Sequence, residues 1–278
     1  MRLKERLSRA LEGCIPSAVI GYLPSRYPVI GNALLLRLHK ALVPYGKKIG
    51  SVLIGLMPNI SSVWAISGTE RVIRRPIVVH LAGDPNPIVV HKELNTIFRL
   101  DISKITFSPG NSGERKKLLS IIDDGDVVLD MFACVGNLSL PIATNKDPRA
   151  VVCVELNPYA YRFLLENIAE NRVQHIVIPL LKNNLMLKMK EKADHVLLGY
   201  LPEPSTEQLA IAVRSVKDGG LVHIHMLSKR GREMDKCIEK VHTIARFRAR
   251  VEQFSWEFVK SYSPTANHIV MRAYISKG

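Results

Sequence analysis

The chain has 278 residues, 47% of them hydrophobic and 23% charged, which is ordinary for a globular protein and excludes a low-complexity one. Its formal net charge is +14, and a strongly basic protein commonly has a polyanionic partner, most often a nucleic acid. No apolar run reaches the roughly 20 residues of a membrane-spanning helix, and Glu12 and Pro16 interrupt any signal-peptide pattern, so we expect a cytoplasmic protein.

The first 110 residues are predicted to form the smaller part of the molecule. Leucines at helical spacing indicate a helix over residues 1–15, and a strand pattern at 33–38 precedes a helix pattern at 45–57. Short strands separated by polar or Gly/Pro turns follow, which favours a small, mostly antiparallel α/β subdomain over residues 51–110 behind an N-terminal segment 1–50. These strands are expected at 61–67, 76–83, 84–94, 96–101 and 104–110.

From residue 111 to 278 strands and helices alternate, which predicts a Rossmann-like α/β domain. The connections imply a parallel sheet with right-handed crossovers, and the last two strands form an antiparallel pair. Helices are expected at 112–125, 137–146, 158–173, 205–220 and 231–246, and strands at 126–132, 150–156, 175–181, 195–201, 221–227, 250–263 and 268–276.

Two acids at consecutive strand ends indicate a nucleotide site. The strand pattern at 126–132 holds Asp130 and turns through Gly136, and the next strand ends in Glu155, placed where a carboxylate usually holds the ribose hydroxyls. NAD or FAD requires a turn with several glycines, because the pyrophosphate approaches the backbone closely. A lone glycine with an acid ahead of it therefore favours S-adenosylmethionine, which carries an ammonium and a sulfonium but no phosphate.

Positive charge is clustered in two segments. Residues 228–250 hold eight basic side chains against three acidic ones, and residues 2–9 hold four against one. Clustering of this kind favours nucleic-acid binding over a uniformly basic surface.

The sequence around these positions resembles a known family. The stretches "RLDISKITFSPGNSGERKKLL", "VVLDMFACVGNLSLPIA", "VELNPYAYRFLLENIAENRV" and "HVLLGYLP" are similar to the archaeal and eukaryotic tRNA guanosine-37 modification family. The resemblance covers about residues 50–275. That family contains a guanosine-37 N1-methyltransferase branch and an aminocarboxypropyltransferase branch of wybutosine synthesis.

Three features of this chain resemble the aminocarboxypropyltransferase branch. Gly110-Asn111 follows Ser108-Pro109 where the methyltransferase branch typically reads Arg-Leu, and Gly199-Tyr200-Leu201-Pro202 stands in place of Asn-Leu-Pro. The third feature is the His-x-His pattern of His223 and His225. As a metal pair these histidines lack a third ligand, and the four cysteines form no C-x-x-C pair, so no metal site is expected and the histidines are interpreted as structural or tRNA-facing.

The resemblance implies transfer of the 3-amino-3-carboxypropyl group of S-adenosylmethionine to C7 of 4-demethylwyosine at position 37 of phenylalanine tRNA. The by-product would be methylthioadenosine. The enzyme would bind the anticodon region of the tRNA, and we expect it to be a monomer. Two alternatives stay open. One is methyl transfer to guanosine-37 or its tricyclic derivative, and the other is a non-catalytic tRNA-binding protein on the same fold.

The resemblance also places the site residues. Lys182 departs from the family pattern, because an acid usually stands there beside Asn183 to contact the adenine, and lysine has no acceptor. The expected cofactor-binding residues are Ser108, Arg115, Asp130, Phe132, Gly136, Glu155 and Asn183, and the expected catalytic residues are Arg115, Gly199 and Tyr200.

Overall fold

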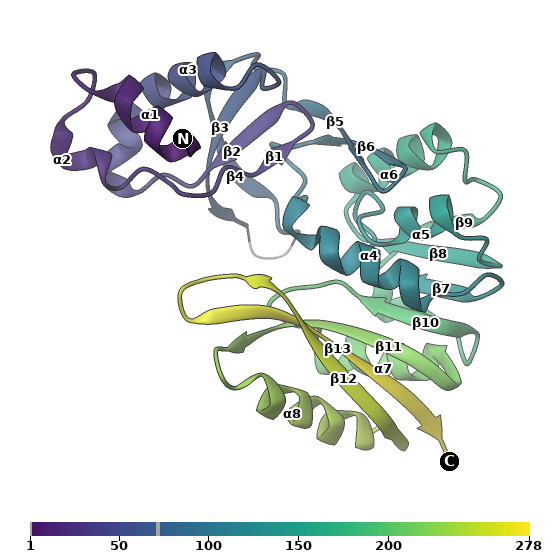
Figure 1. Ribbon diagram of the computed structural model, residues 1–278. Coiled ribbons are helices and arrows are strands. Elements are labelled where there is room, and N and C mark those ends of the chain that lie inside the picture. The colour runs from purple at the N-terminus through teal and green to yellow at the C-terminus, as the bar shows by residue number, and fades with distance from the viewer. Residues whose placement is uncertain (1, 71–72) are drawn as a thin grey trace. The chain divides into compact units, whose positions relative to one another are not determined.

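The computed structural model describes residues 2–70 and 73–278, and the chain divides into two compact units (Figure 1). The N-terminal unit ends at Lys92 and also includes Phe98–Pro109, whereas the C-terminal unit consists of Glu93–Ile97 and Gly110–Gly278. Residue 1, in the first predicted helix, and residues 71 and 72, in the predicted strand-rich subdomain, lie outside the described residues.

The N-terminal unit is a four-stranded sheet in the order β1-β2-β3-β4, with β2 and β3 parallel and the other pairs antiparallel. Leucines of α1 and α3, such as Leu7 and Leu53, share one buried cluster with Leu34 and Val63 of the sheet. Its elements are α1 (Leu3–Leu11), α2 (Ser17–Ile20), β1 (Val29–Ile30), β2 (Ala33–Leu36), η1 (Lys40–Tyr45), α3 (Gly46–Leu56), β3 (Ser62–Thr69) and β4 (Pro76–Gly83).

A hairpin of β5 (Ile88–Glu93) and β6 (Thr96–Asp101) follows. The strand predicted at 104–110 is wrong. The Asp101 carboxylate accepts the Ser103 N–H at 2.8 Å, and the Asp101 carbonyl accepts the N–H of Ile105, so the chain turns directly after β6. It then enters η2 (Pro109–Asn111).

The C-terminal unit is built on a seven-stranded sheet in the order β12-β13-β11-β10-β7-β8-β9. The pairs among β7 to β11 are parallel, and β13 runs antiparallel between β11 and β12, which confirms the Rossmann-like fold and its antiparallel final pair. The strands are β7 (Val127–Asp130), β8 (Ala150–Glu155), β9 (Val177–Leu181), β10 (Ala193–Leu198), β11 (Val216–Lys229), β12 (Ala249–Ser261) and β13 (Ala266–Lys277).

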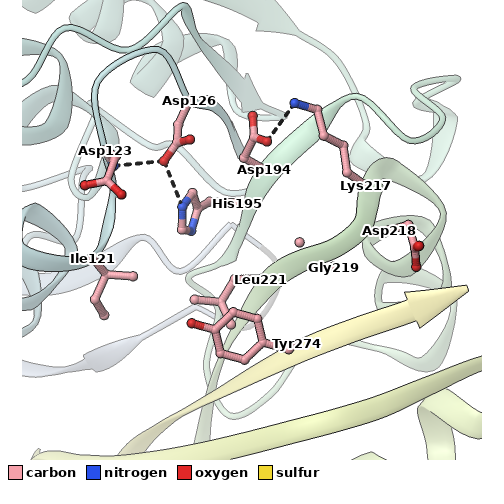
Figure 2. A pocket seen from close by; sticks show the side chains of 11 residues that line it. Ile121, Asp123, Asp126, Asp194, His195, Lys217, Asp218, Gly219, Leu221 and Tyr274 are labelled. Atoms are coloured by element: carbon pink, nitrogen blue, oxygen red, sulfur yellow. Dashed lines mark hydrogen bonds and ion pairs between the residues drawn. The ribbon is translucent and has the colours of Figure 1, made fainter.

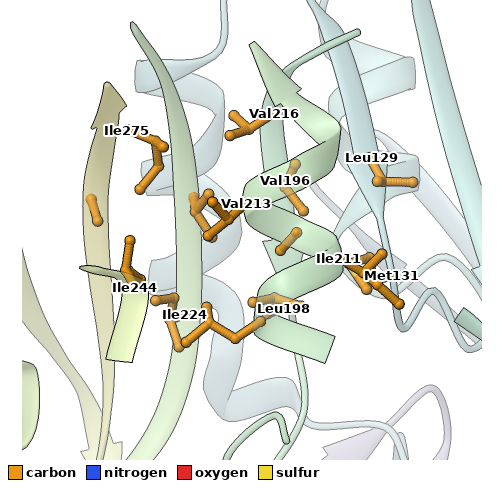
Figure 3. Packing of buried hydrophobic residues seen from close by; sticks show 14 of the residues in the cluster. Leu129, Met131, Val196, Leu198, Ile211, Val213, Val216, Ile224, Ile244 and Ile275 are labelled. Atoms are coloured by element: carbon orange, nitrogen blue, oxygen red, sulfur yellow. The ribbon is translucent and has the colours of Figure 1, made fainter. Parts of the chain in front are cut away.

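Helices cover both faces of this sheet, with α4, α5 and α6 on one side and α7 and α8 on the other (Figure 1). The second side is apolar. Alternate residues of each strand, such as Val196 of β10 and Ile224 of β11, pack against Ile211 and Val213 of α7 (Figure 3). The helical elements are α4 (Ser112–Ile121), α5 (Ser139–Asn145), α6 (Pro158–Glu170), η3 (Asn184–Met186), α7 (Thr206–Ser215) and α8 (Glu233–Ala245).

One prediction for this unit is corrected, and one open alternative is decided. The helix predicted at 205–220 ends at Ser215, because Val216 already pairs with Ala193 and begins β11. His223 and His225 lie inside β11 and are 0% and 2% exposed, so they are structural and do not face tRNA.

None of the helices in the described part of the chain is long and apolar enough to cross a membrane.

Candidate active site

The strands of the parallel sheet end at one edge, and Asp130 is the last residue of β7 at that edge. Its side chain is fully buried, and Oδ1 accepts the N–H of Phe132 at 3.0 Å. Oδ2 has no hydrogen-bond partner among the described residues. Burial raises the pKa of Asp130 to about 7, and the nearby Glu155 adds to the rise, whereas interactions with the Phe132 N–H and with Ser139 oppose it. The carboxyl edge of the sheet therefore holds a buried acid with one oxygen that is not hydrogen-bonded to any residue that the structure describes.

Glu155 ends β8, the neighbouring strand, and is fixed by two backbone donors. Its Oε2 accepts the N–H of Cys134 at 2.7 Å, and Oε1 accepts the N–H of Asn157 at 2.6 Å. Burial raises the pKa of this carboxyl as well. Each carboxylate oxygen has a second lone pair, so Glu155 retains acceptor capacity for two hydroxyl donors.

The turn between β7 and α5 is as tight as the lone glycine indicated. Gly136 has φ +92°, and a Cβ at that position would lie 2.2 Å from Cγ of Leu140. Cys134 also adopts a positive φ, +54°, which brings its N–H to Glu155. Burial raises the pKa of the Cys134 thiol, so this cysteine is not poised as a nucleophile.

Phe132 and Tyr200 come together although 67 residues lie between them in the chain. They follow the adjacent strands β7 and β10, and their rings stack with centroids 5.1 Å apart and an interplanar angle of 24°. Gly199 precedes Tyr200, and a Cβ there would lie 3.0 Å from Cδ1 of Leu138. The end of β10 thus presents backbone and an aromatic ring, with no amide or carboxylate side chain at residue 199.

Asn183 and Asn184 make different hydrogen bonds after β9. The Asn183 Oδ1 accepts the N–H of Leu185 and caps η3. Asn184, which the sequence analysis did not single out, is 7% exposed and donates to the carbonyl of Met131 at 2.9 Å. Asn184 thereby ties the end of β9 to the residue between Asp130 and Phe132. The Asn-Asn pair that begins two residues after the end of β9 was the available signal for it.

Arg115 is also held by a partner that sequence spacing does not reveal. It is 1% exposed, and its Nε and one terminal nitrogen reach both carboxylate oxygens of Glu93, at 3.0 and 2.5 Å. This bidentate pair occupies the guanidinium fork, and Glu93 was not among the predicted residues. Ser108 belongs to the N-terminal unit, directly before η2. The roles predicted for Arg115 and Ser108 remain predictions.

A cavity of about 270 Å³ lies at the opposite, amino-terminal edge of the strands (Figure 2). His195 lies 3.1 Å from Asp126 there, and Lys217 pairs with Asp194 at 2.6 Å. No predicted cofactor residue is among the residues that line it. No group of three or more potential metal ligands occurs in the described ranges 2–70 and 73–278.

Residues 89–252 match the TRM5/TYW2 methyltransferase domain family, and residues 7–86 match the TYW2 N-terminal domain. The first match alone spans more than half of the chain. The chain belongs to the TRM5/TYW2 family. Its members among the solved structures share the mixed α/β fold with a mostly parallel central sheet.

Relatives in this family carry more than one activity. A Pyrococcus horikoshii tRNA(Phe) (4-demethylwyosine(37)-C(7)) aminocarboxypropyltransferase is 30% identical over 99% of this chain and 98% of its own length. A Pyrococcus abyssi tRNA (guanine(37)-N(1))-methyltransferase, Trm5b, is 29% identical over 94% of this chain and 78% of its own length. A Saccharolobus solfataricus tRNA 4-demethylwyosine(37)-methyltransferase, Taw21, is 26% identical over 88% of this chain and 92% of its own length.

Solved structures from both branches resemble this chain. Trm5b from P. abyssi superimposes with a TM-score of 0.85 at 28% identity, over 94% of this chain and 78% of that one. P. horikoshii TYW2 in complex with MeSAdo gives a TM-score of 0.81 at 29% identity, over 99% of this chain and 100% of that one. The family is therefore established, whereas the choice between its reactions depends on the site itself.

Proposed function

We propose that this enzyme transfers the 3-amino-3-carboxypropyl group of S-adenosylmethionine to C7 of 4-demethylwyosine at position 37 of phenylalanine tRNA, with release of methylthioadenosine. The observation that carries the proposal is the end of β10, where Gly199 and Tyr200 offer backbone and a ring but no polar side chain at residue 199 to hold a reacting nitrogen. A carbon acceptor requires no such group.

The residues at the carboxyl edge fit S-adenosylmethionine. Oδ2 of Asp130 has no hydrogen-bond partner among the described residues, and an ammonium beside it would favour the charged carboxylate. Glu155 retains lone pairs for the two ribose hydroxyls. When bound, S-adenosylmethionine supplies an electrophilic carbon next to its sulfonium, and the orientation of the ligand decides which carbon reacts.

The chain's own residues orient the two reactants. Asp130 and Glu155 hold the donor from adjacent strands, and the stacked rings of Phe132 and Tyr200 provide a flat apolar surface at the same edge. A tricyclic base presents an extended π-face for which such a surface is suited. The proton on the attacked carbon leaves after bond formation, so no strong base is required in the bond-forming step.

The extent of similarity supports the same choice. The aminocarboxypropyltransferase relative aligns with this chain from end to end, with 98% of its length covered. The Trm5b relative is longer, with 78% covered, whereas 92% of Taw21 is covered, so length distinguishes this chain from Trm5b but not from Taw21.

Methyl transfer to guanosine-37 or to its tricyclic derivative is the second candidate. The structural agreement with Trm5b, at a TM-score of 0.85, and the similarity to Taw21 favour it. The two candidates differ in which carbon of the donor reaches the tRNA and in the nucleoside released, so one labelling experiment separates them.

The enzyme is incubated with phenylalanine tRNA carrying 4-demethylwyosine and with donor labelled either in the methyl group or in the carboxypropyl arm. Our proposal expects arm label in the tRNA and one equivalent of methylthioadenosine. Methyl label with adenosylhomocysteine contradicts it and supports the second candidate. If neither labelled donor transfers label to the tRNA and the tRNA still binds, the protein is non-catalytic. A parallel tRNA with unmodified guanosine-37 tests the acceptor.

Donor binding is measured separately by titration calorimetry. Glu155→Gln removes a charge-assisted acceptor, so we expect the Kd for S-adenosylmethionine to rise about 10- to 100-fold. Asp130→Asn is expected to act similarly. The matched control is Asp123→Asn, which lines the cavity at the amino-terminal edge of the strands. We expect this variant to bind S-adenosylmethionine with unchanged affinity. Equal Kd values for Glu155→Gln and the native enzyme would refute the ribose assignment.

A further inference from the structure

The loop that follows β10 is held at its far end by an ionic cluster. The carboxylate of Glu203 lies between two lysines of α8. Nζ of Lys240 is 2.5 Å from Oε2, and Nζ of Lys236 is 3.1 Å from Oε2 and 3.2 Å from Oε1. Both lysines belong to the segment that the sequence analysis assigned to nucleic-acid binding.

These lysines differ from ordinary surface cations. The side chain of Lys240 is 9% exposed and that of Lys236 is 21% exposed, so both have given up most of their hydration. Such burial is costly unless an acid compensates it. Partial burial of Glu203 opposes its ionisation, yet hydrogen bonds from Lys240 and Lys236 hold the pKa of this carboxyl below its usual range. Glu239, the other acid within reach, is on α8 itself and is 56% exposed.

The same loop is fixed at two further points closer to β10. The carbonyl of Pro202 accepts the N–H of Leu227 at 2.7 Å, which ties the loop to β11. The ring of Tyr200 stacks on Phe132. Only two residues separate Tyr200 from Glu203, and one of them is the anchored Pro202, so we expect a displacement at Glu203 to reach Tyr200 through Pro202.

We propose that Glu203, Lys236 and Lys240 are positioning residues that hold Gly199 and Tyr200 in place for the acceptor base. In this arrangement α8 contributes to catalysis through the loop, and its two buried lysines do not bind tRNA phosphates. The inference rests on the proposed function, because it takes the end of β10 as the place where the acceptor lies.

The kinetic test compares Glu203→Gln and Lys240→Met with the conservative Lys240→Arg. We expect Glu203→Gln and Lys240→Met to lower kcat about 10-fold or more, since small displacements of positioned groups have large effects on rate. The Kd for tRNA should stay within about twofold, because no phosphate contact is lost. Lys240→Arg retains the charge and should recover most of kcat. Arg246→Met, at the end of α8, removes a charge outside the cluster and serves as the control.

The outcomes that overturn the proposal are distinct. A Kd for tRNA that rises several-fold with kcat at saturating tRNA unchanged would assign these lysines to RNA binding. Unchanged kcat and unchanged Kd would leave the cluster without a positioning role. Glu203 is 34% exposed, so Glu203→Gln keeps the test open should Lys240→Met not fold.

A measurement on the free enzyme separates this inference from the proposed function. We expect the amide hydrogen of Leu227, bonded to Pro202, to exchange about tenfold faster in Glu203→Gln than in the native protein. Unchanged exchange contradicts the positioning role whatever the reaction is. Native enzyme that lacks carboxypropyl transfer while exchange responds as expected refutes the proposed function alone.

Discussion

The two faces of the seven-stranded sheet are built from different chemistry. Toward α7 and α8 the sheet presents Val196, Ile224 and Met271, all fully buried. On the opposite face the neighbouring residues of β11 and β13 are polar, among them His223 and Arg272, which are 0% and 4% exposed, whereas β10 places the apolar Leu197 there. In β11 and β13 apolar side chains on one face therefore alternate with polar side chains on the other. We call the second face, which holds Arg272, the charged face.

The charged face is bonded to α4 in a way that specifies orientation. Arg272 of β13 donates to Glu114 of α4 at 2.6 Å, and Nε2 of His225 lies 3.9 Å from the other oxygen of Glu114. Lys117, one turn later, pairs with Glu257 of β12 at 3.0 Å. Apolar contacts are retained when a helix shifts slightly, whereas a buried ion pair stabilises the fold much less when its partners are displaced. The comparison suggests that the apolar face supplies stability and the charged face fixes the position of α4.

The largest effect is expected from Arg272→Met, which leaves Glu114 buried without its cation. We expect a loss of about 3–5 kcal/mol in the free energy of unfolding, measured by urea titration. The double variant Glu114→Leu with Arg272→Met removes both charges and should lose markedly less. A double variant as unstable as the single one would show that packing rather than ionic pairing governs this face.

On the apolar face, the free energy of unfolding should depend only on the side-chain volume that a substitution removes. Ile224→Ala is expected to lower the free energy of unfolding by about 3 kcal/mol and Ile224→Val by about 1 kcal/mol, because the cost scales with the buried methyl groups removed. Neither loss should depend on pH between 5.5 and 8. A pH-dependent loss would break the distinction between the faces.

A smaller effect concerns protonation on the charged face. Burial holds the pKa of His223 well below its usual range, so at acidic pH the unfolded chain binds a proton that the folded one does not. Stability therefore falls as pH drops below about 6.5, by roughly 1 kcal/mol per pH unit, and is unaffected above it. His223→Gln should lack this contribution. The test is the stability difference between the two proteins at pH 5.5 and 8, and an identical difference at both would refute the assignment.

The smallest effect is expected for an ion pair outside both faces. Arg162 and Glu166 pair at 3.0 Å on α6, with the arginine side chain 72% exposed. Arg162→Ala should change the free energy of unfolding by only about 0.3–0.5 kcal/mol, and less in high salt. A loss comparable with that of Arg272→Met would show that burial is not what distinguishes the charged face.

Much of the C-terminal unit could be predicted because its signals are local. Apolar runs bounded by turns marked the strands, and Asp130 and Glu155 stand at strand ends, where the parallel fold brings them to one edge. The start of α6 also depends on neighbouring residues, because Asn157 caps the helix and Pro158 occupies its first turn.

What the sequence could not give are partners that only the fold brings together. Glu93 and Arg115 belong to the same unit, but the chain passes through the N-terminal unit between them. No sequence periodicity therefore predicts their ion pair. The lysines of α8 fall in the segment predicted to bind nucleic acid, and their acid, Glu203, lies 33 residues upstream of Lys236, where no sequence pattern reveals it. The histidines of β11 alternate as a solvent-facing strand would, and burial by α4 is a tertiary fact.

The short segment Glu93–Ile97 has a consequence for how this protein can be divided. The chain passes between its two units three times, after Lys92, after Ile97 and after Pro109. Within the segment, the Ile97 N–H donates to Asn171 at 2.8 Å, while Glu93 holds Arg115. A single cut at residue 110 would leave a buried guanidinium without its counter-ion. Recombination that exchanges N-terminal units between relatives must therefore keep this pentapeptide with the C-terminal unit. Residues 93–97 are inherited with that unit although they lie within the N-terminal part of the sequence.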